Sequence, residues 1–313
     1  MRVNVINLSV PHYNLGAAKL AAWLRSQGWT VVEQGLGEAD LVCLSAIFSW
    51  DLPKGVRIVA HYDGRAEIWA GGPGFHHMAE WWKEQTGITA HIGLDWRFER
   101  HRGDYRMCFA ARGCPWDCHF CGVTKWEGKE YTLDWDFEPA PILCDNNLTD
   151  EPVDFQEHIV RRYQERGVRL LDANSGFEPR NFTEETYRRW KALLRGPWRF
   201  AYDYLPERSA ALRVLRILRD EPSKKKRVYV LIGNEPFEAC LQRATEVIEN
   251  GGEPYCQPFL PKTALDRHDF VIRYDWTRDK LVHFARYFNR HLNKYSTLEE
   301  YRCATKQPFA MLS

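Results

Sequence analysis

Apolar residues recur along the chain with two different spacings, and these spacings predict strands that alternate with helices. In the first 96 residues, short apolar runs predict four strands, at residues 3–8, 30–33, 40–44 and 67–70. Residues 15–27 carry apolar side chains at helical spacing up to Gly28, and residues 75–86 predict a second helix. Residues 55–62 fit a strand or a helix. This order predicts a doubly wound, Rossmann-like α/β domain over residues 1–96.

A second series of strand–helix repeats occupies residues 103–265, after a charged stretch at residues 95–104 that we interpret as a linker. Its predicted strands are residues 105–110, 141–144, 168–171, 198–201, 227–232 and 254–259. Six repeats are too few for a complete barrel, which has eight and typically needs ~250 residues. We therefore expect a partial (βα)6 barrel. Residues 266–313 predict a C-terminal helical extension, with an amphipathic helix at residues 277–294 that covers an end or edge of the barrel.

Composition narrows the class of protein without naming an activity. The chain has 313 residues, 44% of them apolar and 27% charged, which is enough for a substantial core. Its net charge of +1 gives no overall field that favours nucleic acid or an anionic membrane, and the basic run at residues 224–227 fits a solvated loop. No apolar run approaches the length of a membrane span, and the first residues predict a strand and not an export signal. We therefore expect a cytoplasmic protein with no membrane partner and no nucleic-acid partner.

Three cysteines fall within eight residues, in the stretch A-R-G-C-P-W-D-C-H-F-C-G, as Cys114, Cys118 and Cys121. Thiolates are soft ligands, and three on one tight loop can bind three irons of a [4Fe-4S] cluster and leave the fourth iron open. A structural zinc site needs four ligands, and His119 lies inside the loop, where it cannot easily turn back to the same metal. A zinc site and a disulfide pair stay as alternatives. No two of the other six cysteines have the spacing of a metal-binding pair, so we expect a single cluster; they are Cys43, Cys108, Cys144, Cys240, Cys256 and Cys303.

Polar residues follow the predicted strands of the second series, at the end where parallel barrels gather their chemistry. They are Asp145, Asn146 and Asn147 after the second strand, Asp172, Asn174 and Ser175 after the third, Asp203 after the fourth, Gly233 and Glu235 after the fifth, and Gln257 on the sixth. Such a mixed set suits a cofactor with an ammonium group, a ribose and an adenine. The same residue types also favour turns for backbone reasons, so we expect about half of them to be structural.

The sequence C-P-W-D-C-H-F-C resembles the signature of the radical S-adenosylmethionine (SAM) superfamily, C-x3-C-x-aromatic-C, and the resemblance extends over the repeats of residues 105–261. It implies that Cys114, Cys118 and Cys121 bind a [4Fe-4S] cluster and that SAM chelates the open iron. It also implies a partial barrel, the fold that the repeats predict independently. One electron would then cleave SAM and give a 5′-deoxyadenosyl radical, which takes a hydrogen atom from a substrate. A reductant such as flavodoxin or ferredoxin is the implied partner.

The resemblance also assigns parts of SAM to positions of this chain. The implied contacts are Phe120, through its backbone, for adenine, Gly233 and Glu235 on the adenine side, Asp203 for the ribose, and Asp145 and Asn146 for the methionine amino group. The loop after the second strand lacks the family's usual G-G-E sequence, and the glycine motif after the fifth strand departs from the full pattern.

The N-terminal domain resembles, in its layout, the cobalamin-binding domains that precede some radical SAM modules. The matching positions are Pro11, Leu15, Gly16, Asp40, Ile47, Phe48, Gly71, Gly72 and Pro73. The D-x-H-x-x-G motif that supplies a histidine ligand in that family is absent, so we favour a scaffold without cobalamin over one that binds it. The glycines of residues 71–74 either let a ligand approach the backbone or form a plain turn. His76 and His77 are adjacent and face different ways, so we interpret them as surface or helix-start residues and not as a metal pair.

These features support three hypotheses of function. The first is a radical SAM enzyme that abstracts hydrogen from an unidentified substrate, in a transferase, lyase or isomerase reaction. The second is a cobalamin-assisted radical SAM methyltransferase. The third belongs to another class, a non-catalytic metal-binding or nucleic-acid-binding module, and predicts zinc in place of iron. We favour the first because the cysteine spacing opens a run of strand–helix repeats.

Overall fold

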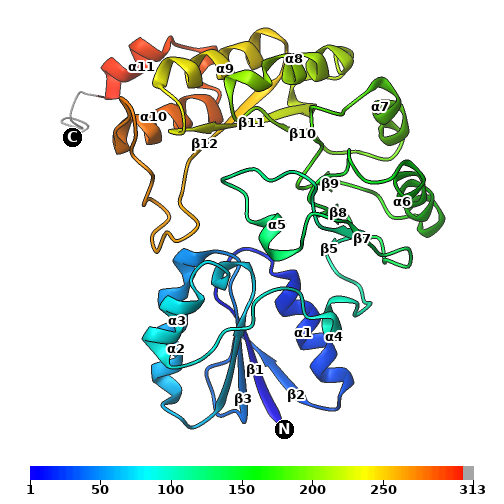
Figure 1. The fold of residues 1–313 in the computed structure, drawn as a ribbon, viewed down its shortest axis with the longest axis vertical. Helices are drawn as coiled ribbons and strands as arrows, with labels where there is room; N and C mark the ends of the chain where they lie inside the picture. Colours follow the sequence, from blue (N-terminus) through cyan, green and yellow to red (C-terminus); the bar gives the residue numbers. More distant parts are fainter. Residues whose placement is uncertain (306–313) are drawn as a thin grey trace, which may run out of the picture. The chain divides into compact units, whose positions relative to one another are not determined.

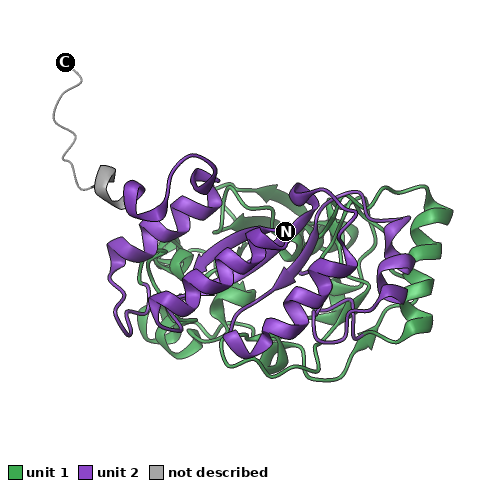
Figure 2. Ribbon diagram, turned by 90° about the horizontal axis from the view of Figure 1, so that it is seen from above, with its two compact units in different colours: residues 1–146, 151–174, 260–269 green, residues 147–150, 175–259, 270–313 purple. Residues whose placement is uncertain are grey.

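Strands and helices alternate along residues 1–305, the part of the chain that the computed structural model describes (Figure 1). The chain divides into two compact units, which Figure 2 colours separately. Unit 1 comprises residues 1–146, 151–174 and 260–269. Unit 2 comprises residues 147–150, 175–259 and 270–313, of which 270–305 are described. Within the described residues, every helix is too short or too polar to cross a membrane.

A four-stranded parallel sheet forms the N-terminal part of unit 1, in the order β2-β1-β3-β4. Its strands are β1 (Arg2–Asn7), β2 (Thr30–Glu33), β3 (Leu41–Ser45) and β4 (Glu67–Gly71). The central strand β3 is buried along its whole length, as a run of consecutive apolar residues predicts for a strand covered on both faces.

Helices cover both faces of this sheet (Figure 1). On one side lie α1 (Leu15–Ser26) and α4 (Trp96–Glu99), and on the other α2 (Leu52–Tyr62) and α3 (Ala79–Thr86). Val5 and Leu24 belong to the core beneath α1, whereas Val42 and Trp82 belong to the core beneath α2 and α3. The region is thus an α/β arrangement built on a parallel sheet, as the alternating strands and helices predict.

The structure decides one open prediction in this region and corrects two others. The ambiguous stretch at residues 55–62 is helical, because it continues α2 behind Pro53, which suits a first helical turn. The helix expected from residue 75 begins only at Ala79, since Pro73–Phe75 form a separate 3-10 turn. The charged stretch expected to be a linker contains α4, whose first turn is capped by the side chain of Asp95.

Unit 1 continues with a three-stranded parallel sheet in the order β5-β8-β9. The strands are β5 (Met107–Cys108), β8 (Ile142–Leu143) and β9 (Asp172–Ala173), and α6 (Val153–Arg166) lies between the last two. The third predicted strand was placed too early. Leu171 is half exposed, and ladder pairing with β8 begins at Asp172, so this aspartate belongs to the strand and not to the loop after it.

Unit 2 contains the parallel sheet β10-β11-β12, formed by β10 (Trp198–Ala201), β11 (Lys226–Ile232) and β12 (Glu253–Pro258). Its helices are α7 (Glu184–Lys191), α8 (Arg208–Ile217), α9 (Phe237–Glu249), α10 (Arg278–Asn289) and α11 (Leu298–Thr305). The helix predicted in the C-terminal extension is α10. It packs against the edge strand β12, and buries Leu281, Phe284 and Phe288.

Five of the six strands predicted in the second series coincide with observed strands, and the third lies just after its predicted range, at β9; all six are parallel to their sheet neighbours. They form two separate three-stranded sheets, one in each unit. The chain is thus a mixed α/β protein with parallel sheets, and the closure of these six strands into one partial barrel stays a prediction.

Candidate functional site

The segment with the three cysteines is a loop closed by a short antiparallel strand pair. Strand β6 (Ala111–Arg112) pairs with β7 (Thr132–Leu133), so the chain leaves and re-enters the loop side by side. Gly113 begins the loop with φ 102°, and a Cβ there would meet the carbonyl oxygen of Glu130. Only glycine fits both conditions, which explains the residue directly before Cys114. The sequence analysis did not predict this pairing, since two-residue strands leave no periodic pattern.

The carboxylate of Glu127, a residue of the loop itself, holds the start of the loop in place through hydrogen bonds and an ion pair. Its Oε2 accepts hydrogen bonds from the Gly113 N–H, at 3.1 Å, and from the Asn146 side-chain amide, at 2.6 Å. Its Oε1 lies 3.1 Å from Arg112 Nη1, and both side chains are largely buried. Sequence reasoning missed Glu127, because it lies one residue beyond the short helix α5 (Val123–Trp126) in a stretch without periodic apolar positions.

The three predicted ligands Cys114, Cys118 and Cys121 are half-buried, and the Cys121 N–H donates to the Cys118 carbonyl at 2.8 Å in a tight turn. The cysteines outside the motif that the structure describes are fully buried instead; they are Cys43, Cys108, Cys144, Cys240 and Cys256. Burial raises the pKa of Cys43 and of Cys108 to about 12, so these thiols stay protonated. Among the eight cysteines whose side chains the structure describes, those of the motif therefore combine thiols with access for a metal group. Cys303 lies where the structure describes no side chains.

The donor set of this loop fits an iron–sulfur cluster better than a single metal ion. Among the described residues, no three His, Cys, Asp or Glu side chains converge as ligands of one ion. In a [4Fe-4S] cluster each thiolate binds its own iron, so the three sulfurs must surround a volume and need not meet at a point. The arrangement does not form the four-ligand site that zinc would require.

Two buried carboxyl groups lie behind the loop, at Asp145 and Glu151. Asp145 is 1% exposed, and its oxygens accept the N–H groups of Ala110 and Ala111, at 2.7 and 3.0 Å. Glu151 is 3% exposed, and neither of its oxygens has a hydrogen bond of ordinary geometry within the described residues. Burial raises the pKa of both groups, and the neighbouring Asp145 raises that of Glu151 further. The two N–H donors favour charge on Asp145, so Glu151 is the group that keeps a proton.

The residues predicted to hold the methionine amino group therefore have internal partners. Both Asp145 oxygens bind the backbone that enters the cysteine loop, and the Asn146 amide binds Glu127. Both residues thus support the path of the loop, and their contacts with a cofactor stay predictions. Asn174 has an exposed side chain, while its N–H donates to Leu143 in the ladder.

Unit 2 brings together the other predicted contacts, at the ends of β10 and β11. Asp203 follows β10, and its Oδ1 accepts the Leu231 N–H at 3.3 Å. Burial, reinforced by the nearby Glu207, raises the pKa of Asp203 to about 7. Gly233 follows β11 with φ 90°.

A fully buried arginine that the sequence analysis did not identify organises the same strand ends. Arg243, on α9, donates to the carbonyl oxygens of Tyr202 at 2.6 Å and Leu231 at 2.9 Å. Its Nε lies 3.1 Å from Glu235 Oε2. Glu235, predicted on the adenine side, is thus ion-paired. The only signal in the sequence was a charge on the apolar face of a predicted helix.

The remaining prediction for adenine is Phe120, in unit 1. Its ring is half-buried and meets the ring of His119 edge-on, with centroids 5.3 Å apart. The structure thus places Phe120, Asp145 and Asn146 on and behind the cysteine loop within unit 1, and Asp203, Gly233 and Glu235 together within unit 2. Their contacts with SAM stay predictions.

The glycines after β4 serve the chain's own packing. Gly72 has φ 103°, and a Cβ there would lie 2.6 Å from the Ala46 carbonyl oxygen. This close backbone approach favours the plain turn over a ligand contact at this position. His76 and His77, which follow, are not surface residues. Their Nε2 atoms are buried, and both rings pack against Trp126 of α5, at centroid distances of 5.1 and 5.9 Å.

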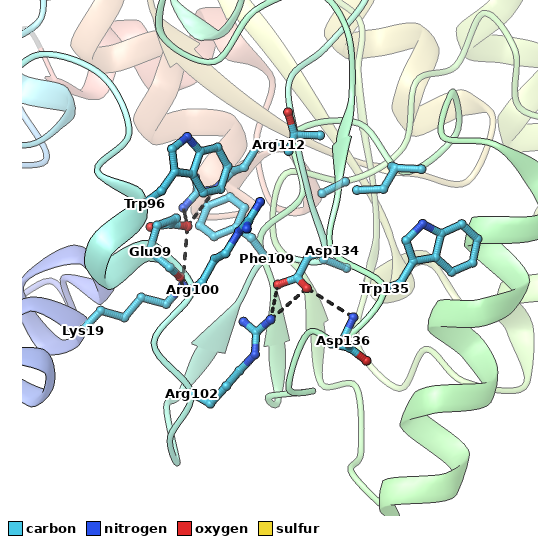
Figure 3. Close-up of a pocket in the computed structure, with 14 residues that line it drawn as sticks. Lys19, Trp96, Glu99, Arg100, Arg102, Phe109, Arg112, Asp134, Trp135 and Asp136 are labelled. Carbon is cyan, nitrogen blue, oxygen red and sulfur yellow. Dashed lines mark hydrogen bonds and ion pairs between the residues drawn. The ribbon is translucent and has the colours of Figure 1, made fainter. Parts of the chain in front are cut away.

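A cavity of about 330 Å³ lies in unit 1 beside the segment that enters the cysteine loop (Figure 3). Charged side chains from several segments line it, and most are paired: Arg102 binds Asp134 through two contacts of 2.8 and 2.6 Å. Arg112 pairs with Glu99 and stacks over Phe109, with its guanidinium carbon 3.3 Å from the ring centroid. Arg112, which forms an ion pair with Glu127 at the start of the cysteine loop, is therefore also part of the cavity wall.

Comparison with known proteins rests on structure. No protein-family model matches the chain, and no curated protein matches its sequence. The solved structure of the radical SAM methyltransferase TsrM from Kitasatospora setae, with cobalamin and a [4Fe-4S] cluster bound, matches with a TM-score of 0.62 at 13% identity. The match covers 84% of this chain and 77% of that one.

A weaker match is OxsB, a cobalamin-dependent SAM radical enzyme solved with aqua-cobalamin and SAM bound. It has a TM-score of 0.48 and 13% identity, and the match covers 92% of this chain and 56% of OxsB. At these identities a likeness concerns the fold, and only the TsrM match is strong enough to use. The chain thus shares the fold of TsrM over most of its length.

Proposed function

We propose that this protein is a radical SAM enzyme. The observation that carries the proposal is the C-x3-C-x2-C loop of Cys114, Cys118 and Cys121, directly after the first strand of the second series, in a chain with the fold of TsrM. When bound, the cluster would supply one electron to SAM, which breaks a sulfur–carbon bond. A reductant such as flavodoxin or ferredoxin would deliver that electron, and the substrate is unidentified.

The chain's own residues would bind and orient these groups. The three thiolates would hold the cluster, on a loop whose entrance is fixed by Gly113, Glu127 and the strand pair β6–β7. In unit 2, Arg243 would orient Glu235 and the ends of β10 and β11 as a rigid wall for a nucleoside.

The experiment is anaerobic reconstitution of the full chain with iron and sulfide, followed by reduction in the presence of SAM. We expect about four irons per chain and release of 5′-deoxyadenosine. Cys118→Ser should lose both, whereas Cys43→Ala, which removes a buried thiol from the N-terminal sheet, should keep both. Zinc in place of iron, or full cleavage by the Cys118 variant, would contradict the proposal.

A second candidate is a cobalamin-assisted methyltransferase, and the extent of the TsrM match favours it. At the carboxyl ends of β1 and β3, Phe48 stacks on Trp50 with ring centroids 4.4 Å apart and planes 9° apart, and His12 meets Phe48 edge-on. These half-exposed flat faces fit one side of a planar macrocycle. They would hold and orient cobalamin, which supplies a cobalt centre able to carry a methyl group.

The test is retention of cobalamin by the full chain after gel filtration, followed by absorbance. We expect Trp50→Ala to weaken retention and Trp135→Ala, a matched change of an exposed tryptophan elsewhere in unit 1, to leave it unchanged. Failure of the unchanged chain to retain cobalamin would remove this candidate and leave the first proposal intact.

A further inference from the structure

Residues 260–269 follow the last strand of unit 2 but belong to unit 1. A buried contact anchors them there: Ser49 Oγ donates to the Ala264 carbonyl oxygen at 2.6 Å, and Ala264 is 1% exposed. Ser49 belongs to the loop after β3 of the N-terminal sheet. The segment therefore has a fixed position in unit 1, and with it Lys262, two residues before Ala264.

Lys262 reaches the cysteine loop from this segment. Its Nζ donates to the carbonyl oxygen of Cys121 at 2.6 Å. The peptide N–H of Cys121 is already engaged with Cys118, so both polar backbone groups of this predicted ligand have partners. A lysine ammonium thus lies at hydrogen-bond distance from the backbone of one of the three cysteines.

The surroundings of Lys262 leave its charge without a contacting carboxylate. Within the described residues, no Asp or Glu oxygen lies within ion-pair distance of its Nζ. The nearest acid that acts on it is Asp117, which is exposed and paired with Lys129 at 3.0 Å. Lys125 adds a second positive charge that acts on the same site. The local field beside Cys121 is therefore positive.

A positive field acts differently on the two redox states of an iron–sulfur cluster. The reduced cluster carries one more negative charge than the oxidised cluster, so a nearby cation stabilises the reduced state more. Net charge and hydrogen bonds near the ligands are among the factors that set the potential of such clusters. We propose, on the basis of the proposed function, that Lys262 raises the reduction potential of the cluster and so eases the transfer of one electron from the external reductant to the cluster. Lys262 acts through the cluster's surroundings and is a positioning residue.

The test is a redox titration of the reconstituted full chain, followed by electron paramagnetic resonance. Lys262→Gln keeps a donor for the Cys121 carbonyl but removes the charge. At a fixed potential, its ratio of reduced to oxidised cluster should fall on the order of tenfold, which is about 59 mV for a one-electron couple. Lys262→Arg keeps the charge and should stay close to the unchanged protein. Lys125→Gln should shift the ratio less, because Lys125 is exposed and its charge is screened by solvent.

Each outcome decides the inference. An unchanged potential in Lys262→Gln with full iron content overturns it and leaves the radical SAM proposal intact. Loss of iron in Lys262→Gln but not in Lys262→Arg would assign Lys262 a structural role and also overturn it. Equal shifts in Lys262→Gln and Lys262→Arg would show that geometry, and not charge, sets the potential. If the unchanged chain binds no iron, the proposed function itself fails.

Discussion

Both units place a buried aspartate after a strand, and they stabilise it in different ways. In unit 1, Asp145 accepts two backbone N–H groups and lies beside a second acid, Glu151. In unit 2, Asp203 accepts one N–H group and also has an acid nearby, Glu207, but the fully buried Arg243 offsets part of the negative charge. The first arrangement requires a retained proton, and the second requires a permanent positive charge. Residues that look alike in the sequence therefore depend on different conditions.

The two units also differ in which groups hold the residues at the strand ends in place. Around the cysteine loop, backbone groups supply the donors, so the loop's path depends on the exact position of Ala110 and Ala111. In unit 2, the guanidinium of Arg243 binds the ends of β10 and β11 and the carboxylate of Glu235. The positions of these three groups therefore depend on a single side chain. Substitutions can test each half of this contrast.

The largest effect is expected from Arg243→Met. The change leaves the carbonyl groups of Tyr202 and Leu231 and the carboxylate of Glu235 without their buried donor. Breaking such a pair from one side should lower the free energy of unfolding by about 3–5 kcal/mol, measured by urea titration. Arg188→Met is the control in the same unit, because Arg188 and its partners Glu184 and Glu185 are all more than half exposed, so the side chain should be removable without measurable loss. A similar small loss in both variants would refute the contrast.

Asp145→Ala should rank second. It removes the acceptor for the Ala110 and Ala111 N–H groups, two buried donors that would lose their partner. We expect a loss of about 2–4 kcal/mol in the free energy of unfolding and a lower iron content after reconstitution. Asp136→Ala, an exposed aspartate in the same unit, is the matched control. Full stability of the Asp145 variant would mean that the loop entrance does not depend on this carboxylate.

Glu151→Gln should reveal the retained proton. An acid whose folded-state pKa is raised binds protons more tightly when folded, so stability falls as pH rises from its unfolded pKa, about 4.3, through the folded value. Removing that titration should make the variant gain stability relative to the unchanged chain as pH rises, by about 1.4 kcal/mol for each pH unit between the two pKa values, so the gain should be larger at pH 8 than at pH 5. Thermal unfolding at both pH values measures it. A gain that is equal at both pH values would exclude proton retention as its cause.

Lys129→Ala should have the smallest effect. Lys129 and Asp117 form an ion pair beside the cysteine loop, but both side chains are more than half exposed, and solvent screens the pair. We expect no measurable change in unfolding or in iron content. A clear loss of stability would show that charge alone, without burial, supports this loop.

Much of the fold could be predicted from the sequence, because apolar spacing reports which faces a segment buries. The strands β1, β3 and β11 and the helices α1, α6 and α10 follow from that spacing. Very short elements could not be predicted. The pair β6–β7 and the helix α4 contain too few residues for a periodic pattern, and contacts distant in sequence stabilise them.

The sequence by itself determined the three cysteines, since their spacing is a property of the chain and needs no neighbour to be recognised. Only the tertiary structure decided what the polar strand-end residues do. The partners of Asp145 lie 35 and 34 residues away, that of Asn146 lies 19 residues away and that of Glu235 lies eight residues away. The residues next to each of these positions do not indicate which partner it has. Tertiary structure also brought Lys262 to Cys121, 141 residues away. Local spacing fixes which groups a segment offers, whereas burial and long-range contact fix which of them remain available for chemistry.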